Sequence, residues 1–164
     1  FKRLRQICDQ NSILLVFDEV QVGVGRTGKL WGYENLGVEP DIFTSAKGLA
    51  GGIPIGAMMC KKFCDVFEPG NHASTFGGNP FVCASGLAVL QTIEKDHLLE
   101  NVLARGEQLR SRLRAIAKKY PKLFKEVRGW GLINGMEIYE EVSLTSPDIV
   151  KSALSEGLLL APAG

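Results

Sequence analysis

The strongest limit on the fold comes from a run of five apolar residues that ends in an acid. Residues 13–17 have the sequence ILLVF, and Asp18 follows directly. A short apolar run without alternation is typical of a strand that is buried on both faces, as in a parallel sheet. Residues 41–45 and 55–60 are two further strand-like runs. Short strands joined by short connections predict an α/β fold with a mostly parallel sheet.

Two long helices are predicted in the middle of the chain. Asn79 is a good N-cap, and Pro80 suits the first helical position. Residues 81–93 are apolar almost all round, which predicts a buried helix. Leucine, valine and isoleucine then recur at three- and four-residue steps over residues 98–116, which predicts an amphipathic helix with a basic outer face.

The chain changes character between these two helices. Residues 127–138 and 157–161 resemble strands of a second kind, and a helix is expected over residues 149–155. We therefore expect residues 1–96 to be the C-terminal part of a large α/β domain, and residues 97–164 to be an incomplete, smaller α+β domain. The sequence begins within a helical pattern and ends just after a strand-like run. We expect a fragment of a longer protein, inactive on its own.

The composition is that of a soluble globular protein and disfavours several classes of partner. Of the 164 residues, 45% are apolar and 23% are charged, and the net charge is +1. This balance points to neither nucleic acid nor an anionic membrane as a partner. No apolar run reaches the ~18 residues of a membrane span. We expect a cytoplasmic protein, with an organelle left open because the N-terminal segment is missing.

The four cysteines do not suggest a disulfide framework or a metal site. Their spacing is irregular, at Cys8, Cys60, Cys64 and Cys83. The gap between Cys60 and Cys64 suits a metal, but no second Cys or His pair accompanies it at zinc-site spacing. We therefore expect reduced thiols in an intracellular protein, and no metal.

The loop GVGRTGKL resembles three phosphate-binding patterns and matches none of them fully. Its glycines fit G-x-G-x-x-G, but that pattern needs the glycines directly at a strand's end and a substantial helix after them. A P-loop needs a hydroxyl where Leu30 stands, and a cysteine phosphatase loop needs its nucleophile where Val20 stands. A nucleotide-binding module that uses the stretch from Gly23 to Lys29 stays open as an alternative.

Asp18 and Lys47 are the first two candidates for chemistry. Both follow predicted strands, and in open α/β sheets ligands bind at the carboxyl ends of the strands. Lys47 is the one charged residue in residues 42–60. An amine in apolar surroundings loses its proton more readily, and a neutral amine attacks carbonyl groups. Without a ligand, Asp18 would cap a helix or pair with Arg26, and Lys47 would extend into water.

Two further candidates lie downstream. Residues 74–80 (STFGGNP) combine hydroxyls, a glycine pair and a helix start, which suits a phosphate, although an ordinary capped turn has the same pattern. Arg128, in VRGWG, could hold a carboxylate by two parallel hydrogen bonds or be a plain surface charge. An acid, a reactive lysine, a phosphate cradle and a carboxylate clamp are together what pyridoxal phosphate (PLP) chemistry needs.

The same residues carry a resemblance to a known family. The run LLVFDEVQVGVGRTGKLWGYENLGVEPDIFTSAKGLAGGIPIGA, followed by STFGGNP and VRGWGLINGMEI, resembles the class III, or ornithine-type, PLP-dependent aminotransferases. The resemblance covers nearly the whole chain. It implies the PLP-dependent transferase fold type I, with part of the large-domain sheet and the start of the C-terminal domain.

The resemblance also implies a role for each matching residue. Asp18 matches the aspartate that pairs with the pyridine nitrogen, and Gln21 the glutamine near the phenolic oxygen of the ring. Lys47 matches the lysine that bonds to the PLP aldehyde and shuttles a proton. Thr75 matches the threonine that reaches the PLP phosphate of the neighbouring subunit, which implies a homodimer. Arg128 matches the arginine that binds the substrate α-carboxylate.

The resemblance implies transamination of an ω-amino group. The segments EPGNHASTFGGNP and RGWGLI look most like the enzymes that act on N-acetylornithine, with 2-oxoglutarate as amino acceptor, in arginine biosynthesis. Ornithine or 4-aminobutyrate as the donor stays open, since those relatives share the DEVQ-like block. A catalytically inactive paralogue is a further alternative.

Overall fold

The computed structural model describes residues 1–163, which form two compact units. The first unit comprises Phe1–Glu107 with Trp130–Ile133, and the second comprises Gln108–Gly129 with the residues from Asn134 onward. Residues 130–133 belong to the first unit, where the N–H of Leu132 donates to the carbonyl of Arg26 at 2.9 Å. The domain boundary expected between residues 96 and 97 stays a prediction.

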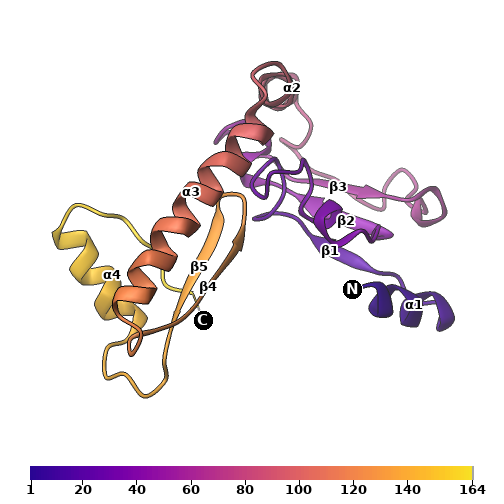
Figure 1. Cartoon of the computed structure of the whole chain (residues 1–164). Coiled ribbons are helices and arrows are strands. Elements are labelled where there is room, and N and C mark those ends of the chain that lie inside the picture. Colours follow the sequence, from indigo (N-terminus) through magenta and orange to yellow (C-terminus); the bar gives the residue numbers. More distant parts are fainter. Residues whose placement is uncertain (164) are drawn as a thin grey trace. The chain divides into compact units, whose positions relative to one another are not determined.

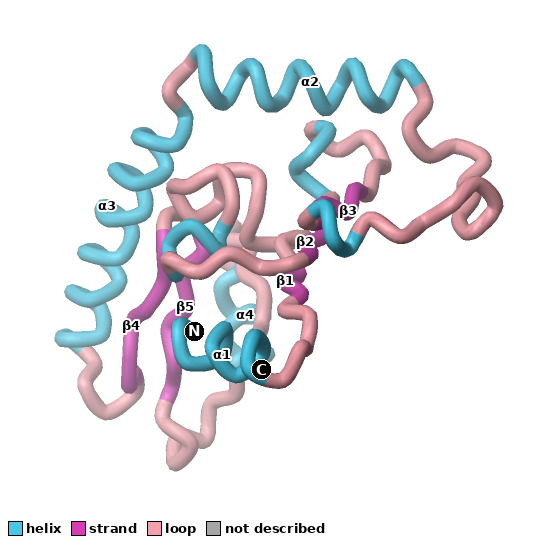
Figure 2. Tube along the Cα trace, turned by 90° about the vertical axis from the view of Figure 1, so that its right-hand side faces the viewer, coloured by secondary structure: helices cyan, strands magenta, loops and turns pink. Residues whose placement is uncertain are grey.

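The first unit is built on a three-stranded sheet in the order β1-β2-β3. These strands are β1 (Val16–Asp18), β2 (Ile42–Ser45) and β3 (Ala57–Cys60). β1 and β2 run parallel with Asp18 opposite Thr44, and β3 runs antiparallel to β2. Figures 1 and 2 show the three strands side by side. The three predicted strands are confirmed, and each is shorter than the stretch predicted for it.

The N-terminal helix and one 3-10 turn cover one end of this sheet. Helix α1 (Lys2–Gln10) contributes Cys8 to a small core with Leu15 and Val38. The 3-10 helix η1 (Gly32–Leu36) adds Leu36 to the edge of that core. Helix α1 agrees with the helical pattern expected at the start of the chain, and the core that it shares with Leu36 packs against Phe17 of β1.

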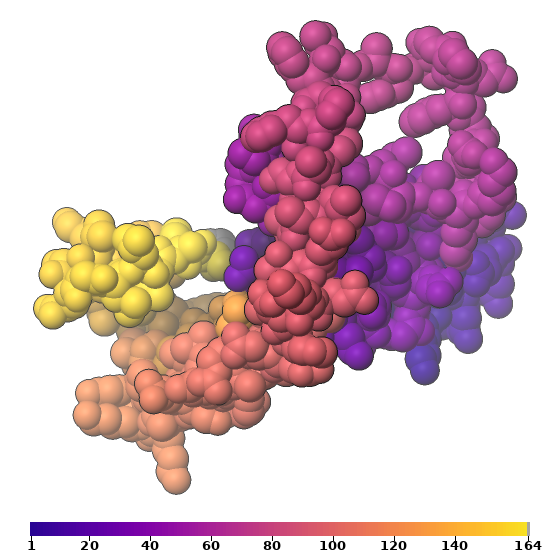
Figure 3. Space-filling view, turned by 90° about the horizontal axis from the view of Figure 1, so that it is seen from above, coloured from indigo at the N-terminus to yellow at the C-terminus, as the bar shows by residue number. Residues whose placement is uncertain are grey.

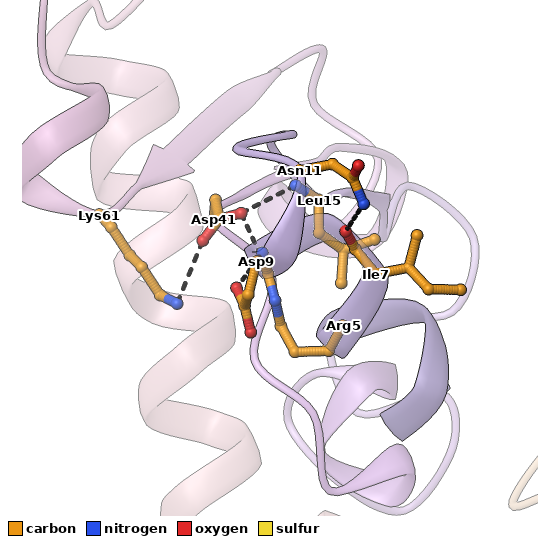
Figure 4. Close-up of polar contacts among 7 residues, drawn as sticks. All are labelled: Arg5, Ile7, Asp9, Asn11, Leu15, Asp41 and Lys61. Atoms are coloured by element: carbon orange, nitrogen blue, oxygen red, sulfur yellow. Dashed lines mark hydrogen bonds and ion pairs between the residues drawn. The ribbon is translucent and has the colours of Figure 1, made fainter.

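Asp41 ties the start of β2 to three neighbouring segments, as Figure 4 shows. It is 4% exposed. Its Oδ2 accepts hydrogen bonds from Arg5 at 2.7 Å and from the N–H of Leu15 at 2.8 Å, and its Oδ1 accepts one from Lys61 at 3.2 Å. Burial by itself raises the pKa of Asp41. The hydrogen bonds from Leu15, Arg5 and Lys61 outweigh that effect, so the pKa lies below its ordinary value of 3.8.

Replacing Asp41 by asparagine is expected to destabilise the full-length protein by about 3 kcal/mol at pH 7, because it leaves Arg5 and Lys61 without their shared buried carboxylate. A depressed folded-state pKa contributes stability above the unfolded value, and this is lost as the pH falls through the folded pKa. The difference between parent and variant should therefore close below about pH 4. Urea unfolding at several pH values measures it.

Asp9→Asn is the matched control, since Asp9 also pairs with Arg5, at 2.7 Å, but its side chain is 62% exposed. An exposed pair is expected to contribute less than about 1 kcal/mol. Equal unfolding free energies for the two variants at pH 7 would contradict the role given to Asp41.

Helix α2 (Pro80–Lys95) begins as the sequence predicted, but it is not buried. The Asn79 side chain accepts a hydrogen bond from the N–H of Val82 at 3.1 Å, as an N-cap does. However, Phe81 is 69% and Leu87 57% exposed. The apolar run of residues 13–17 is likewise largely exposed, although a strand buried on both faces was predicted. An apolar pattern shows which residues favour burial. It does not show whether the element that would bury them lies within residues 1–163.

The remaining elements are α3 (Leu98–Lys119), β4 (Phe124–Trp130), β5 (Ile133–Ile138) and α4 (Ser146–Ser155). β4 and β5 form a two-stranded sheet. The strand predicted over residues 157–161 is wrong, because no strand of the described chain pairs with this segment. None of the described helices is long and apolar enough to cross a membrane.

Candidate functional site

The parallel pairing of β1 and β2 brings two of the predicted site residues to one edge of the sheet. Asp18 is the last residue of β1 and lies opposite Thr44 of β2. Lys47 follows Thr44 by three residues and opens the 3-10 helix η2 (Lys47–Ala50). Asp18 and Lys47 lie at or just after the carboxyl ends of their strands. Because the strands are parallel, these two ends lie at the same edge of the sheet, which is where open α/β sheets bind ligands.

The Asp18 carboxylate is exposed, and only one of its two oxygens accepts hydrogen bonds. Its Oδ1 accepts hydrogen bonds from the N–H of Val20 at 2.9 Å and from the hydroxyl of Thr44 at 3.3 Å. Within residues 1–163, no hydrogen bond reaches Oδ2, and no ion pair joins Asp18 to Arg26. The ion-pair alternative is therefore wrong, and one carboxylate oxygen is available to a ligand.

Lys47 is exposed and has an unusual backbone conformation. Its φ is +48°, in the left-handed region that residues other than glycine seldom adopt. Among the described residues, no hydrogen bond or ion pair holds its amine. A Cβ added at Gly52 or Gly56 would meet nothing within 4 Å, so these two glycines border open space.

Gln21 and Thr75 are also exposed. Gln21 lies in the turn that follows β1, three residues after Asp18. Thr75 lies in the loop before α2, where the hydroxyl of Ser74 accepts a hydrogen bond from the N–H of Gly77 at 2.9 Å. A cavity of about 830 Å³ borders this loop, visible in Figure 3 between the magenta segments. Its lining residues include Gly56, His72, Ser74 and Gly77.

Arg128 belongs to the second unit, on β4, and is engaged with two acids. Its guanidinium donates to Glu126 at 2.9 Å and forms a short contact with Glu137. The hydrogen bond to Glu137, then that to Glu126, raises the pKa of Arg128 above its ordinary value. In turn, Lys125 and then Arg128 hold the pKa of Glu137 below its ordinary range. Arg128 is thus a fully charged group on an exposed strand.

The glycine-rich loop is packed against its own unit. A Cβ at Gly23 would lie 2.7 Å from the carbonyl oxygen of Glu19 and 3.0 Å from the Trp31 ring. At Gly28, with φ +88°, it would collide with the Leu103 side chain. The loop leads into η1, which has five residues. A dinucleotide fingerprint needs a longer helix and open glycines, so the geometry does not favour nucleotide binding.

Sequence reasoning missed Glu19, the acid beside Asp18. Glu19 is 2% exposed, and its carboxylate accepts hydrogen bonds from the N–H groups of Gly32 at 2.6 Å and Tyr33 at 2.8 Å. Glutamate is rarely buried without partners, and the position of Glu19 directly after β1 was the available signal. Over residues 1–163, no cluster of three or more His, Cys, Asp or Glu side chains is arranged to hold a metal ion.

Comparison with known proteins decides the family. The family model described as Aminotransferase class-III matches residues 1–164. The chain belongs to the class-III aminotransferases. The fold type I expectation is confirmed with it, since the similar solved structures are aminotransferases of this fold.

Similar relatives carry the name acetylornithine aminotransferase. A protein of Synechocystis sp. is 81% identical over the whole chain, and one of Nostoc sp. is 72% identical. The chain spans 38% of the length of each of these curated relatives.

Two kinds of solved structure are similar to the chain. The ornithine aminotransferase of Toxoplasma gondii has a TM-score of 0.89 at 36% identity, covering 98% of this chain and 38% of that one. The acetylornithine aminotransferase of Elizabethkingia anophelis has a TM-score of 0.84 at 34% identity, covering 98% and 43%.

Proposed function

We propose that the full-length protein is a PLP-dependent aminotransferase that moves the ω-amino group of N-acetylornithine to 2-oxoglutarate. The observation that carries the proposal is the placement of Asp18 and Lys47 at the carboxyl ends of the adjacent parallel strands β1 and β2. The names of the 81% and 72% identical relatives support this donor. Their longer chains make the activity a proposal for the whole protein.

The donor set at the sheet edge fits PLP. The unused Asp18 Oδ2 suits the pyridine nitrogen, and the unpaired Lys47 amine suits the aldehyde. The hydroxyls and N–H groups of the loop at Thr75 suit the phosphate of PLP bound by a second copy of the chain. When bound, PLP supplies an electron sink that makes the proton on the donor's amino-bearing carbon acidic.

Each residue then has a defined task. Asp18 would place a negative charge beside the ring nitrogen of bound PLP and so favour a proton there. Lys47 Nζ would hold the aldehyde of bound PLP and, as a free amine, would accept a proton from the substrate carbon. The side-chain amide of Gln21 would donate to the phenolic oxygen of the ring. The open space beside Gly52 and Gly56 would leave room for the ring.

Substrate and partner assignments are part of the same proposal. Arg128 offers the planar pair of N–H donors that a substrate α-carboxylate requires, in exchange for its contacts with Glu126 and Glu137. Thr75 is exposed on the loop before α2 and would reach the phosphate bound by a second copy of the chain, in a homodimer. We place this dimer in the cytoplasm.

The ornithine aminotransferase structures motivate one alternative, ornithine as the donor. Purified full-length protein with PLP is assayed side by side on N-acetylornithine, ornithine and 4-aminobutyrate, with glutamate formation as the readout. We expect kcat/KM for N-acetylornithine to exceed the other two by about tenfold or more, since a pocket that binds the acetamide leaves polar groups unpaired without it.

Each other outcome points to a different function. Preference for ornithine or 4-aminobutyrate identifies the donor as that amine. Absence of PLP-dependent turnover with all three donors indicates an inactive paralogue. Saturable ATP or NAD binding at the loop of Gly23 would indicate the nucleotide-binding module.

A further inference from the structure

Glu19 has the most constrained side chain near the candidate site, and the chemistry assigned above does not use it. It is 2% exposed, while the neighbouring Asp18 is open to solvent. Its Oε2 accepts from the N–H of Gly32 at 2.6 Å and its Oε1 from the N–H of Tyr33 at 2.8 Å. Both carboxylate oxygens are therefore bound to the start of η1, thirteen and fourteen residues further along the chain.

The backbone of Glu19 is held as firmly as its side chain. Its N–H donates to the carbonyl of Thr44 at 3.0 Å, which extends the β1–β2 ladder by one residue. Its carbonyl accepts from the N–H of Gly23 at 2.8 Å. Residue 19 thus joins the end of β1, the end of β2 and the glycine-rich loop, all through hydrogen bonds.

Asp18, by contrast, is exposed, and only one of its carboxylate oxygens is hydrogen-bonded. Its carboxylate is held by the N–H of Val20 and, at the longer distance of 3.3 Å, by the Thr44 hydroxyl. Val20 and Asp18 flank Glu19 directly. A shift of Glu19 would move both the Asp18 backbone and the N–H group that orients its carboxylate.

We propose that Glu19 is the positioning residue for Asp18: its buried carboxylate clamps η1 to the end of β1 and so fixes the direction in which Asp18 presents its free oxygen. The inference rests on the proposed function, because it assigns Asp18 to the ring nitrogen of PLP. The absence of a side chain at Gly32 leaves room for the Glu19 carboxylate. A Cβ at position 32 would lie 3.0 Å from Glu19 Oε2 and 2.9 Å from Val22 Cγ2.

The test uses Glu19→Gln in the full-length protein. Glutamine has the same shape, but its NH₂ group would face one of the two N–H donors, so one hydrogen bond becomes a donor–donor contact. The control is Glu34→Gln. Glu34 also accepts a hydrogen bond from a backbone N–H of the same turn, that of Trp31 at 2.7 Å, but it is exposed and does not contact the segment at Asp18.

Three quantities are measured for parent and variants: the PLP dissociation constant by equilibrium dialysis, the pH midpoint of the visible absorption of bound PLP, and the melting temperature of the apo protein. Glu19→Gln is expected to weaken PLP binding about tenfold, the equivalent of one lost charge-assisted hydrogen bond. It is also expected to shift the pH midpoint, and Glu34→Gln to change neither.

The outcomes distinguish failure of this inference from failure of the proposed function. If the parent binds PLP and Glu19→Gln lowers only the melting temperature, Glu19 is structural and this inference is overturned. If the parent itself does not bind PLP, the proposed function falls and the inference with it. Should Glu19→Gln fail to fold, Gly32→Ala keeps the carboxylate but displaces it, and an unchanged affinity and pH midpoint in that variant would overturn the inference.

Discussion

Replacing Lys47 by arginine is expected to lower kcat/KM for transamination by at least about a thousandfold in the full-length protein. The guanidinium stays protonated in proteins, so it can neither bond to an aldehyde nor accept a proton from the substrate carbon. The substitution keeps the charge and most of the length of an exposed side chain. The fold should therefore persist, and steady-state kinetics together with a thermal unfolding curve measure both effects.

Borohydride reduction of the PLP-loaded parent, followed by peptide mapping, should place the label on the peptide that contains Lys47. Lys29→Arg is the control, because Lys29 is an exposed lysine of the glycine-rich loop to which we assign no chemistry. A label on another lysine, or equal activity of Lys47→Arg and Lys29→Arg, would remove Lys47 from the mechanism.

Replacing Asp18 by asparagine is the second large change, with an expected fall in kcat of about a hundredfold to a thousandfold. Asparagine keeps an oxygen for the N–H of Val20 and the hydroxyl of Thr44, so the local structure should persist. What would be lost is the negative charge that, in the proposed function, holds a proton on the ring nitrogen of PLP. Single-turnover kinetics with the amino donor isolate this step.

Asp65→Asn serves as the comparison for Asp18→Asn. Asp65 is an exposed acid of the same unit, and it pairs with Lys62 at 2.6 Å. It should leave the single-turnover rate unchanged. A rate for Asp18→Asn within a factor of about three of the parent would contradict electrostatic support of the ring by Asp18.

Local patterns predicted the elements well, because the signals that start helices and end strands act over a few residues. Asn79 and Pro80 fixed the beginning of α2, and the residue after the apolar run of β1 proved to be the acid at the sheet edge. The positions of Asp18 and Lys47 followed from one physical rule about strand ends. That rule needs only the direction of the chain and the parallel pairing of two strands.

The predictions that were wrong or missing concern contacts between residues that are far apart in sequence. The exposed Phe81 and Leu87 and the unpaired segment 157–161 required knowledge of covering or pairing partners, which a periodic pattern does not contain. The burial of Glu19 required knowing that the N–H groups of residues 32 and 33 return to the end of β1. Hydrogen bonds that close such loops are set by the fold as a whole.

The left-handed backbone at Lys47 has a consequence for engineering. A lysine at φ +48° is strained by about 1 kcal/mol, whereas glycine adopts this conformation without steric cost. Ser12 and His97 share the feature, with φ of +54° and +50°, and carry no assigned chemistry. Glycine at those two positions would relieve strain with no loss of chemistry. At position 47 the same exchange would raise the free energy of unfolding, but it would remove the amine to which we assign the bond with PLP.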